Sequence, residues 1–190
     1  MCHGYRMVRY ADDFVVLCAT AEAATAVLSL IRAWVEGNGL TLHPEKTRIA
    51  DLSRPAGYFD YLGYRFYAGD TGKLSRSIKP KKQKALRARL AQLTRRASGI
   101  STAQTVQQLN RWLVGVFGHF KHAHRRVLAT LDAHVRYRLR HIFAKRHGMA
   151  GCAKCWKAHH LWPNAYFVTL GLFSMATARD LILHSHRGLT

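Results

Sequence analysis

The sequence is short of acidic residues: it has 10 Asp and Glu against 30 Lys and Arg, a formal net charge of +20. The shortage is uneven. Residues 1–70 hold eight acids and seven Lys or Arg, whereas residues 71–190 hold 23 Lys or Arg against only Asp132 and Asp180. Such an excess of positive charge repels itself unless a polyanion neutralises it, which indicates nucleic acid as the partner. A solvated basic surface, or one that binds an anionic membrane, is the alternative.

Two further shortages exclude other classes of protein. No apolar run approaches the ~20 residues that a membrane-spanning helix needs, and the first residues show no signal-peptide pattern. The four cysteines are too few for a dense disulfide framework, which favours a reducing cytosol: Cys2, Cys18, Cys152 and Cys155. Hydrophobic residues still make up 48% of the chain, so a packed core is expected rather than disorder.

Hydrophobic periodicity predicts strands and one helix in the first part of the chain. Thr20 is expected to cap this helix, and the Gly-Asn-Gly at residues 37–39 to end it. Its predicted buried face is Val27, Leu28, Ile31, Trp34 and Val35. The strands are expected at residues 7–10, 14–19, 40–43, 58–67 and 73–78, with residues 48–50 in extended chain.

The pattern changes near residue 79 and predicts only helices afterwards. Pro80 suits a first helical position, and helices are expected over residues 81–96, 106–120 and 125–146, with short ones beyond 150. This order predicts an α+β fold, in which an antiparallel sheet with one packed helix precedes an all-α helical domain. The expected parts are residues 1–78, 79–148 and 149–190.

Two adjacent carboxylates, Asp12 and Asp13, fall at the predicted turn between the first two strands. Such a pair is costly unless a cation lies beside it. Mg²⁺ prefers hard oxygen ligands, with Mn²⁺ as the alternative ion, and two such ions about 4 Å apart can hold the attacking and leaving oxygens of a nucleotidyl transfer. Neighbouring strand residues point to opposite faces, so Asp12 is the firmer predicted ligand, and a third carboxylate must come from elsewhere. If only these two adjacent aspartates are considered, the alternative to a metal site is an ordinary turn, in which Asp is common.

The wider pattern resembles the palm of reverse transcriptases, whose YxDD hairpin carries two catalytic aspartates. Here YADD occupies residues 10–13 between two apolar strands, and a helix follows. The resemblance implies that Asp12 and Asp13 are catalytic metal ligands.

Two later segments extend the resemblance. Residues 39–47, GLTLHPEKT, look like the next polymerase motif, which implies that Lys46 neutralises or protonates the leaving pyrophosphate. If only its position is considered, the favoured interpretation of Lys46 is a solvated lysine in a turn. Residues 59–66, FDYLGYRF, resemble the hairpin that grips the primer strand, where Gly63 lets the backbone approach closely. That role is implied for Tyr61, Leu62, Gly63 and Tyr64, with an ordinary strand pair as the alternative.

The second half resembles group II intron reverse transcriptases. Residues 109–120, LNRWLVGVFGHF, are similar to their thumb-like maturase region, although Val116 stands where an aromatic residue is usual. Residues 162–174, WPNAYFVTLGLFS, look like the tail of many such proteins. The resemblance covers most of the chain. It implies an RNA-directed DNA polymerase and maturase of the bacterial cytoplasm, associated with RNA and the nucleoid, which copies intron RNA from a DNA primer with deoxynucleotides.

One catalytic element of that family is not seen. The first palm motif, with its own catalytic aspartate, lies upstream of the YxDD hairpin, and only nine residues precede Tyr10 here. Residues 1–78 are therefore expected to be the C-terminal part of the palm, residues 79–148 a thumb and maturase bundle, and residues 149–190 the maturase tail. Asp51 and Asp60 belong to later segments and are not expected to substitute. The chain alone is expected not to polymerise, and a separately encoded N-terminal half is a candidate partner.

Basic residues cluster on two of the predicted helices, where they suit phosphate and 2′-hydroxyl contacts to structured intron RNA. Solvated helix faces are the alternative. The predicted nucleic-acid-binding residues are Lys79, Lys81, Lys82, Lys84, Arg87, Arg89, Arg125, Arg126, Arg136, Arg138 and Arg140. Trp112, Trp156 and Trp162 could stack on bases, with the core as the favoured place for Trp112.

A pair of cysteines, Cys152 and Cys155, precedes His159 and His160 and resembles half of a zinc knuckle. The spacing to the histidines is too short for a common zinc finger, so zinc is not expected. Two rival functions stay open. One is an RNA-binding maturase module that aids splicing without DNA synthesis, and the other is a decayed element without activity.

Overall fold

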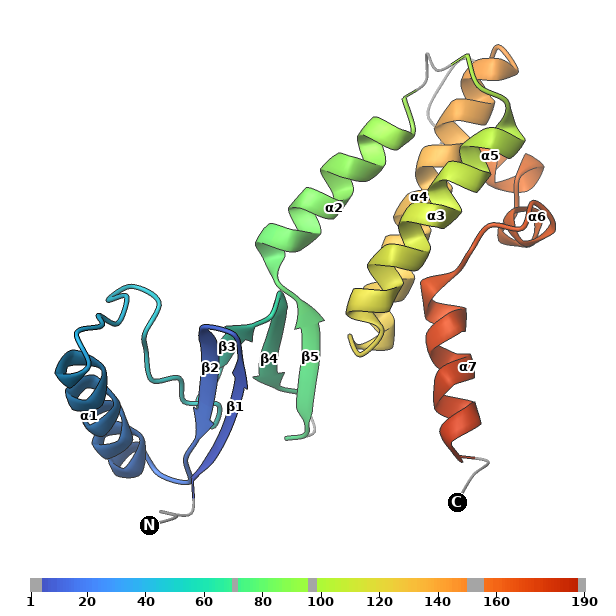
Figure 1. The fold of residues 1–190 in the computed structure, drawn as a ribbon. Helices are drawn as coiled ribbons and strands as arrows, with labels where there is room; N and C mark the ends of the chain where they lie inside the picture. The colour runs from blue at the N-terminus through green and yellow to red at the C-terminus, as the bar shows by residue number, and fades with distance from the viewer. Residues whose placement is uncertain (1–4, 70–71, 96–98, 150–155, 188–190) are drawn as a thin grey trace. The chain divides into compact units, whose positions relative to one another are not determined.

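The computed structural model describes residues 5–69, 72–95, 99–149 and 156–187. The chain divides into two compact units, residues 1–75 and 76–190 (Figure 1). The first unit contains all but one of the strands and a single helix, and the second is helical. The predicted α+β class is confirmed. The predicted division into three parts stays a prediction.

The first unit begins with the predicted hairpin. β1 (Arg6–Tyr10) pairs antiparallel with β2 (Asp13–Leu17), and Tyr10 lies opposite Asp13. α1 (Ala21–Gly37) follows, and the Thr20 hydroxyl caps it by accepting a hydrogen bond from the Ala23 amide at 3.1 Å. Gly39 takes a φ of +71° just past the end of the helix, a conformation that glycine adopts without strain. The predicted cap and stop are confirmed.

A second antiparallel sheet has the order β3-β4-β5. Its strands are β3 (Tyr58–Tyr61), β4 (Tyr64–Ala68) and β5 (Leu74–Ile78), as the sequence predicts. The strand predicted at residues 40–43 is wrong. This segment is irregular and turns at Pro44, with the Lys46 and Thr47 amides bonded to the His43 carbonyl. Alternating side chains make a strand only where a neighbouring backbone completes the ladder.

The first unit has a thin core. Within residues 5–69, the buried apolar side chains are Val27 and Val35, both on α1. Trp34 is 65% exposed, so its predicted place on the buried face is wrong. Met7 and Tyr10 on β1 are 59% and 65% exposed.

The second unit is a helical bundle with a tail of shorter helices. Its elements are α2 (Pro80–Leu93), α3 (Thr102–Phe120), α4 (Arg125–Arg146), α5 (Trp156–Leu161), α6 (Asn164–Thr169) and α7 (Met175–Arg187). α3 starts with a capping box, in which the Ser101 hydroxyl accepts from the Gln104 amide while the Gln104 side chain accepts from the Ser101 amide. The predicted bounds of α4 are confirmed, and α2 starts at Pro80 as expected.

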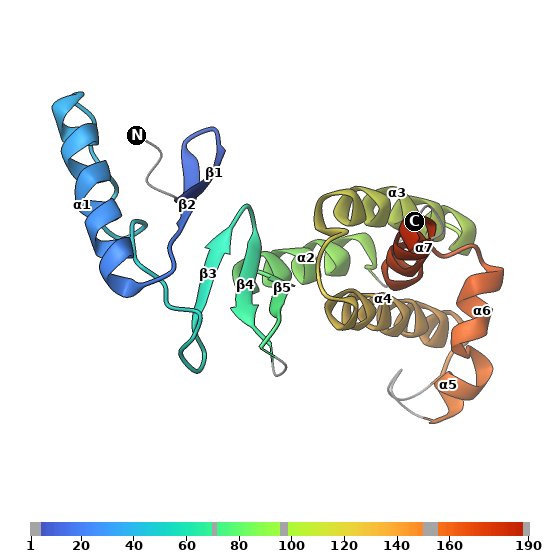
Figure 2. The same ribbon diagram turned by 90° about the horizontal axis from the view of Figure 1, so that it is seen from below.

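The core of the second unit is closely packed. Its fully buried leucines come from three helices, and α7 packs against α3 and α4 (Figure 2). Aromatic side chains of α4, of α6 and of the segment between α5 and α6 extend this core, with Phe143 stacked on Phe167 at 6.1 Å and tilted against Trp162 at 5.6 Å. The leucines are Leu90, Leu109, Leu113, Leu128 and Leu139.

Two polar side chains anchor the start of α7. Asn110 on α3 donates to the Gly171 carbonyl at 2.7 Å and accepts from the Phe173 amide at 2.8 Å. Asp132 on α4 is 3% exposed and accepts from the Ser174 hydroxyl and from the Met175 and Ala176 amides at 2.8–3.1 Å. The anion therefore lies at the positive end of α7, where free amides need acceptors. In the described ranges, no helix is long and apolar enough to cross a membrane.

Candidate metal site and nucleic-acid interface

Asp12 and Asp13 lie at an exposed hairpin tip. Ala11 and Asp12 form the turn between the paired residues Tyr10 and Asp13. Ala11 has a φ of +53°, which is strained for a residue with a Cβ, and the Arg9 Nε donates to its carbonyl at 2.8 Å. Such strain is found at functional sites, where the surrounding structure holds the backbone in place.

The two carboxylates have the chemistry that Mg²⁺ requires. Both side chains are exposed, and in residues 5–69 neither forms an ion pair, so their oxygens are open to a hard cation. They are not a complete site. Among the residues that the structure describes, no three His, Cys, Asp or Glu side chains gather as metal ligands.

The other two candidate acids of this unit already have cationic neighbours. Asp51 accepts from Ser53 and from the Arg54 Nε at 3.0 Å, and the Ser53 hydrogen bonds lower the pKa of its carboxyl. Asp60 faces Arg65 across the β3–β4 pair and binds it bidentately at 2.9 and 3.1 Å. The hydrogen bonds to Asp60 raise the pKa of Arg65. These partners agree with the expectation that neither acid replaces the missing ligand.

Lys46 lies on the predicted turn and is exposed. Its amide donates to the His43 carbonyl at 3.2 Å, which fixes the backbone of the turn. Within residues 5–69, no recorded hydrogen bond or ion pair joins its ammonium group to Asp12 or Asp13. The role of Lys46 stays a prediction.

The hairpin between β3 and β4 has a strained two-residue turn. Leu62 and Gly63 lie between the paired Tyr61 and Tyr64, with φ of +49° and +83°. Two positive φ values in succession normally select Asn or Gly, so Leu62 is an unusual choice. The Tyr61 hydroxyl is buried and, in the part of the chain described, has no hydrogen-bond partner.

Sequence reasoning missed an arginine cluster on this hairpin. The guanidinium carbons of Arg65 and Arg48 lie 3.7 and 4.9 Å from the centre of the Tyr58 ring. Arg48 also donates to the Tyr58 carbonyl at 3.2 Å. The spacing of Tyr58 and Asp60 on one face of a strand, opposite Arg65, is the signal that could have revealed it.

The basic residues predicted on α2 are open to solvent, apart from the half-buried Lys79 that precedes the helix. Arg89 donates to Gln92 at 3.0 Å, an exposed contact on the same helix. Of the described residues 76–95, none is acidic, so this face carries no internal neutralisation.

The predicted arginines of α4 divide into exposed and structural ones. Arg126 is exposed, and Arg125 pairs with Asp180 at 2.7 Å. Arg138 donates to the Thr94 hydroxyl and to the Ala91 and Thr94 carbonyls, at the end of α2.

Two further arginines of α4 are turned inward. Arg140 is 3% exposed and donates to the Trp162 carbonyl and the Asn164 side chain. Burial, with Arg136 close by, lowers the pKa of Arg140. The Nε of Arg136 is itself buried and lacks a hydrogen-bond partner among the described residues. Arg138 and Arg140 therefore stabilise the fold, and little of their side-chain surface is accessible to RNA.

The tryptophans take different places. Trp162 is 7% exposed and belongs to the core, and Trp112 is half-buried. Trp156 is 79% exposed and stacks on His160 with ring centres 5.1 Å apart. Cys152 and Cys155 lie outside the described residues, as does Cys2.

The partial burial of His134 makes the stability of the second unit depend on pH. Partial burial, with Arg87 and Arg138 nearby, lowers the pKa of His134. The unfolded chain then binds a proton that the folded chain resists, so stability is complete above the unfolded pKa of about 6.5 and declines as pH falls below it. We expect urea unfolding, followed by circular dichroism, to have a lower midpoint at pH 5.5 than at pH 7.5.

The His134→Gln variant tests this assignment. It should show a smaller difference between the two pH values. Some difference should remain, because burial also lowers the pKa of His122. An unchanged pH dependence in the variant would contradict the role of His134.

Comparisons with known families match both units. Residues 2–66 match the family model described as reverse transcriptase (RNA-dependent DNA polymerase). Residues 83–162 match the model described as group II intron, maturase-specific domain. Of the curated proteins compared with the chain, none matches it. The first match contains Asp12, Asp13 and Lys46, and the second contains most of the basic residues of α2 and α4.

Proposed function

Because the chain belongs to the family of group II intron reverse transcriptases and maturases, we propose that its second unit binds intron RNA and its first unit contributes two metal ligands to DNA synthesis. The RNA interface consists of the exposed basic residues of α2 with Arg126 on α4. We name these residues the basic face: Lys81, Lys82, Lys84, Arg87, Arg89 and Arg126.

The observation that carries this proposal is the lack of internal neutralisation. The second unit has only two acids, and both are occupied: Asp132 is buried at the start of α7, and Asp180 pairs with Arg125. The charge of the basic face therefore needs an external polyanion. Proteins of this family bind folded RNA, which is such a polyanion. Its phosphates and 2′-hydroxyls are the groups that the basic face would contact.

The proposed interface predicts strongly salt-dependent binding of structured RNA. About six phosphate contacts would make log Kd rise with log salt concentration with a slope near 5. Replacing Lys81, Lys82 and Lys84 by alanine should lower that slope by about 3 and weaken binding of all RNA sequences alike. The measurement is a filter-binding titration of the full chain between 50 and 300 mM KCl.

The matched control for this series is Arg54→Ala, which removes an exposed positive charge of the first unit that is paired with Asp51. This variant should keep the slope of the unmodified chain. Affinity that does not respond to salt would contradict phosphate binding by the basic face.

We propose that Asp12 and Asp13 each offer carboxylate oxygens to Mg²⁺, with Mn²⁺ as the alternative ion. The bound ion would supply charge stabilisation for the transferring phosphoryl group. Asp12 occupies the turn itself, so its side chain has the wider choice of direction. Lys46, exposed on its own turn, would neutralise the leaving pyrophosphate of an incoming deoxynucleotide.

The β3–β4 hairpin is proposed to hold the DNA primer. Gly63 allows a strand to approach the backbone. Arg48 adds positive charge beside Tyr58, whereas the charge of Arg65 is neutralised by Asp60. These features support a contact with a phosphodiester backbone.

DNA synthesis is proposed to require a further polypeptide segment that supplies the third carboxylate. Two observations support this. The described residues contain no third ligand beside Asp12 and Asp13, and the first unit exposes Met7, Tyr10 and Trp34. A separately encoded N-terminal half of the polymerase domain is one source of such a segment.

A further inference from the structure

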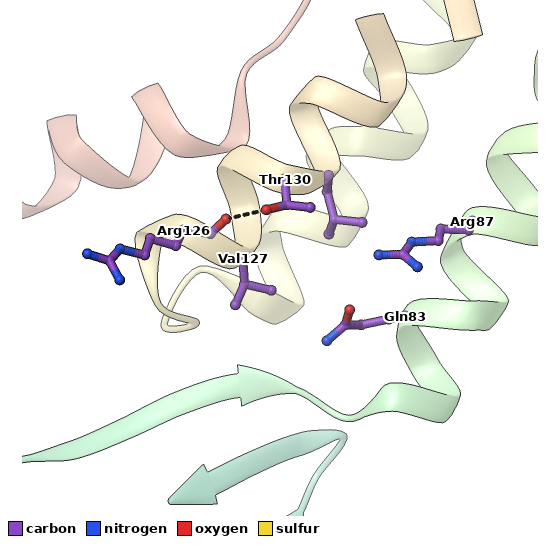
Figure 3. A pocket seen from close by; sticks show the side chains of 6 residues that line it. Gln83, Arg87, Arg126, Val127 and Thr130 are labelled. Carbon is purple, nitrogen blue, oxygen red and sulfur yellow. Dashed lines mark hydrogen bonds between the residues drawn. The ribbon is translucent and has the colours of Figure 1, made fainter. Parts of the chain in front are cut away.

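A cavity of about 170 Å³ lies between α2 and α4 in the second unit. We name it the α2–α4 cavity. Its walls combine an apolar floor with polar groups: Leu131 is 6% exposed, Val127 is half-buried, and the remaining side chains carry hydrogen-bonding atoms. The lining residues are Gln83, Arg87, Arg126, Val127, Thr130 and Leu131 (Figure 3).

The size of the cavity limits its occupant. Sites for whole small molecules usually measure about 300–1,000 Å³, and one water occupies about 30 Å³ in the liquid. The α2–α4 cavity therefore has room for one ring-sized group and not for a complete nucleotide.

The polar groups of the cavity select the kind of ring. Figure 3 shows Arg87 and Gln83 directed from α2 toward Val127 of α4, while the guanidinium of Arg126 points away from them. One N–H of the Gln83 Nε2 donates to the Ile78 carbonyl at 2.7 Å, which leaves its second N–H to donate and its Oε1 to accept. The Thr130 hydroxyl donates to the Arg126 carbonyl at 2.8 Å and can only accept from an occupant.

These groups suit a nucleobase better than a phosphate. A phosphate would find donors on Arg87 and Gln83, but it has no proton for the acceptor oxygens of Gln83 and Thr130, and its charge would lie against the apolar floor. A base has N–H donors for those acceptors, a flat face for the Arg87 guanidinium and an apolar face for Val127 and Leu131. The outward Arg126 can hold the phosphate beside such a base.

Resting on the RNA binding proposed above, we propose that the α2–α4 cavity holds one unpaired base of the bound RNA. The basic face then binds the flanking backbone, and the cavity distinguishes RNA with an extruded nucleotide from continuous duplex.

The experiment compares three RNA hairpins of equal length in their paired stem. One is fully paired, one has a single unpaired adenosine, and one has an abasic nucleotide at the same place. Base stacking contributes ~1–3 kcal/mol, so the full chain should bind the adenosine bulge about tenfold more tightly than either of the others. Kd is measured by filter binding at 150 mM KCl.

Two variants locate the preference. Val127→Phe fills the cavity, and Arg87→Ala removes an exposed guanidinium with little risk to folding; each should reduce the tenfold preference to less than twofold. Arg89→Ala, an exposed arginine of α2 that does not line the cavity, is the matched control. It should weaken binding of all three hairpins equally and keep the preference.

The outcomes separate the two proposals. Equal binding of all three hairpins, equal binding of the abasic and adenosine bulges, or a preference that survives both cavity variants would overturn the base site and leave RNA binding intact. Failure to bind any hairpin at 50 mM KCl would overturn the proposed RNA interface itself.

Discussion

Replacing Asp132 by alanine is expected to destabilise the second unit by about 3 kcal/mol. The substitution removes the acceptor of three hydrogen bonds and leaves the Met175 and Ala176 amides buried without a partner. The substitution also removes a negative charge from the start of α7, where that charge interacts favourably with the helix dipole. Urea unfolding of the full chain, followed by far-ultraviolet circular dichroism, measures the change.

Asp180→Ala is the matched control, because it removes the other acid of the second unit. The Arg125–Asp180 pair is exposed to solvent, with 58% and 33% of the two side chains accessible. Its loss should cost less than about 1 kcal/mol. Equal effects of the two substitutions would show that the buried hydrogen bonds of Asp132 do not anchor α7.

Replacing Asp12 by asparagine is expected to reduce Mg²⁺-dependent primer extension by on the order of 10³-fold, because a metal ligand supplies several kcal/mol of charge stabilisation. The reaction contains an RNA template, a DNA primer, deoxynucleotides and the full chain. It also contains a polypeptide that carries the upstream part of a polymerase domain. Asp13→Asn should also lower the yield, and chelation of Mg²⁺ should abolish it.

Asp51→Asn serves as the control for this assay, since its carboxylate is held by Ser53 and Arg54. It should keep the full yield. The chain without the added polypeptide should give no product, because its described residues hold no third carboxylate at the hairpin. Product from the lone chain would show that another acid completes the site.

The parts of the fold that follow from local patterns were predictable from the sequence. Helix caps and stops act through neighbouring backbone groups, so Thr20, Gly39 and Pro80 could be placed correctly. The hairpin that presents Asp12 and Asp13 is also local, with its turn flanked by two apolar strands. Its register follows from the position of that turn.

The errors concern interactions between distant segments. Residues 40–43 alternate like a strand but do not pair with a neighbouring strand. Trp34 has the spacing of a buried helix face, but no core packs against its side chain, which is 65% exposed. Arg138 and Arg140 carry the same charge as Arg126. Their guanidinium groups donate to backbone carbonyls in distant segments of the chain, and the spacing of residues in the sequence does not reveal these contacts. Charge counts therefore predict that a basic surface exists but not which side chains belong to it.

The anchors of α7 connect positions that are far apart along the chain, with a sequence separation of 61 for Asn110 and Gly171 and of 43 for Asp132 and Met175. During synthesis on the ribosome, α3 and α4 emerge well before the acceptors and donors that complete them. Until α7 arrives, the Asp132 carboxylate and the Asn110 side chain lack these partners. The helical unit should therefore reach its native, protease-resistant form only after α7 has left the ribosome.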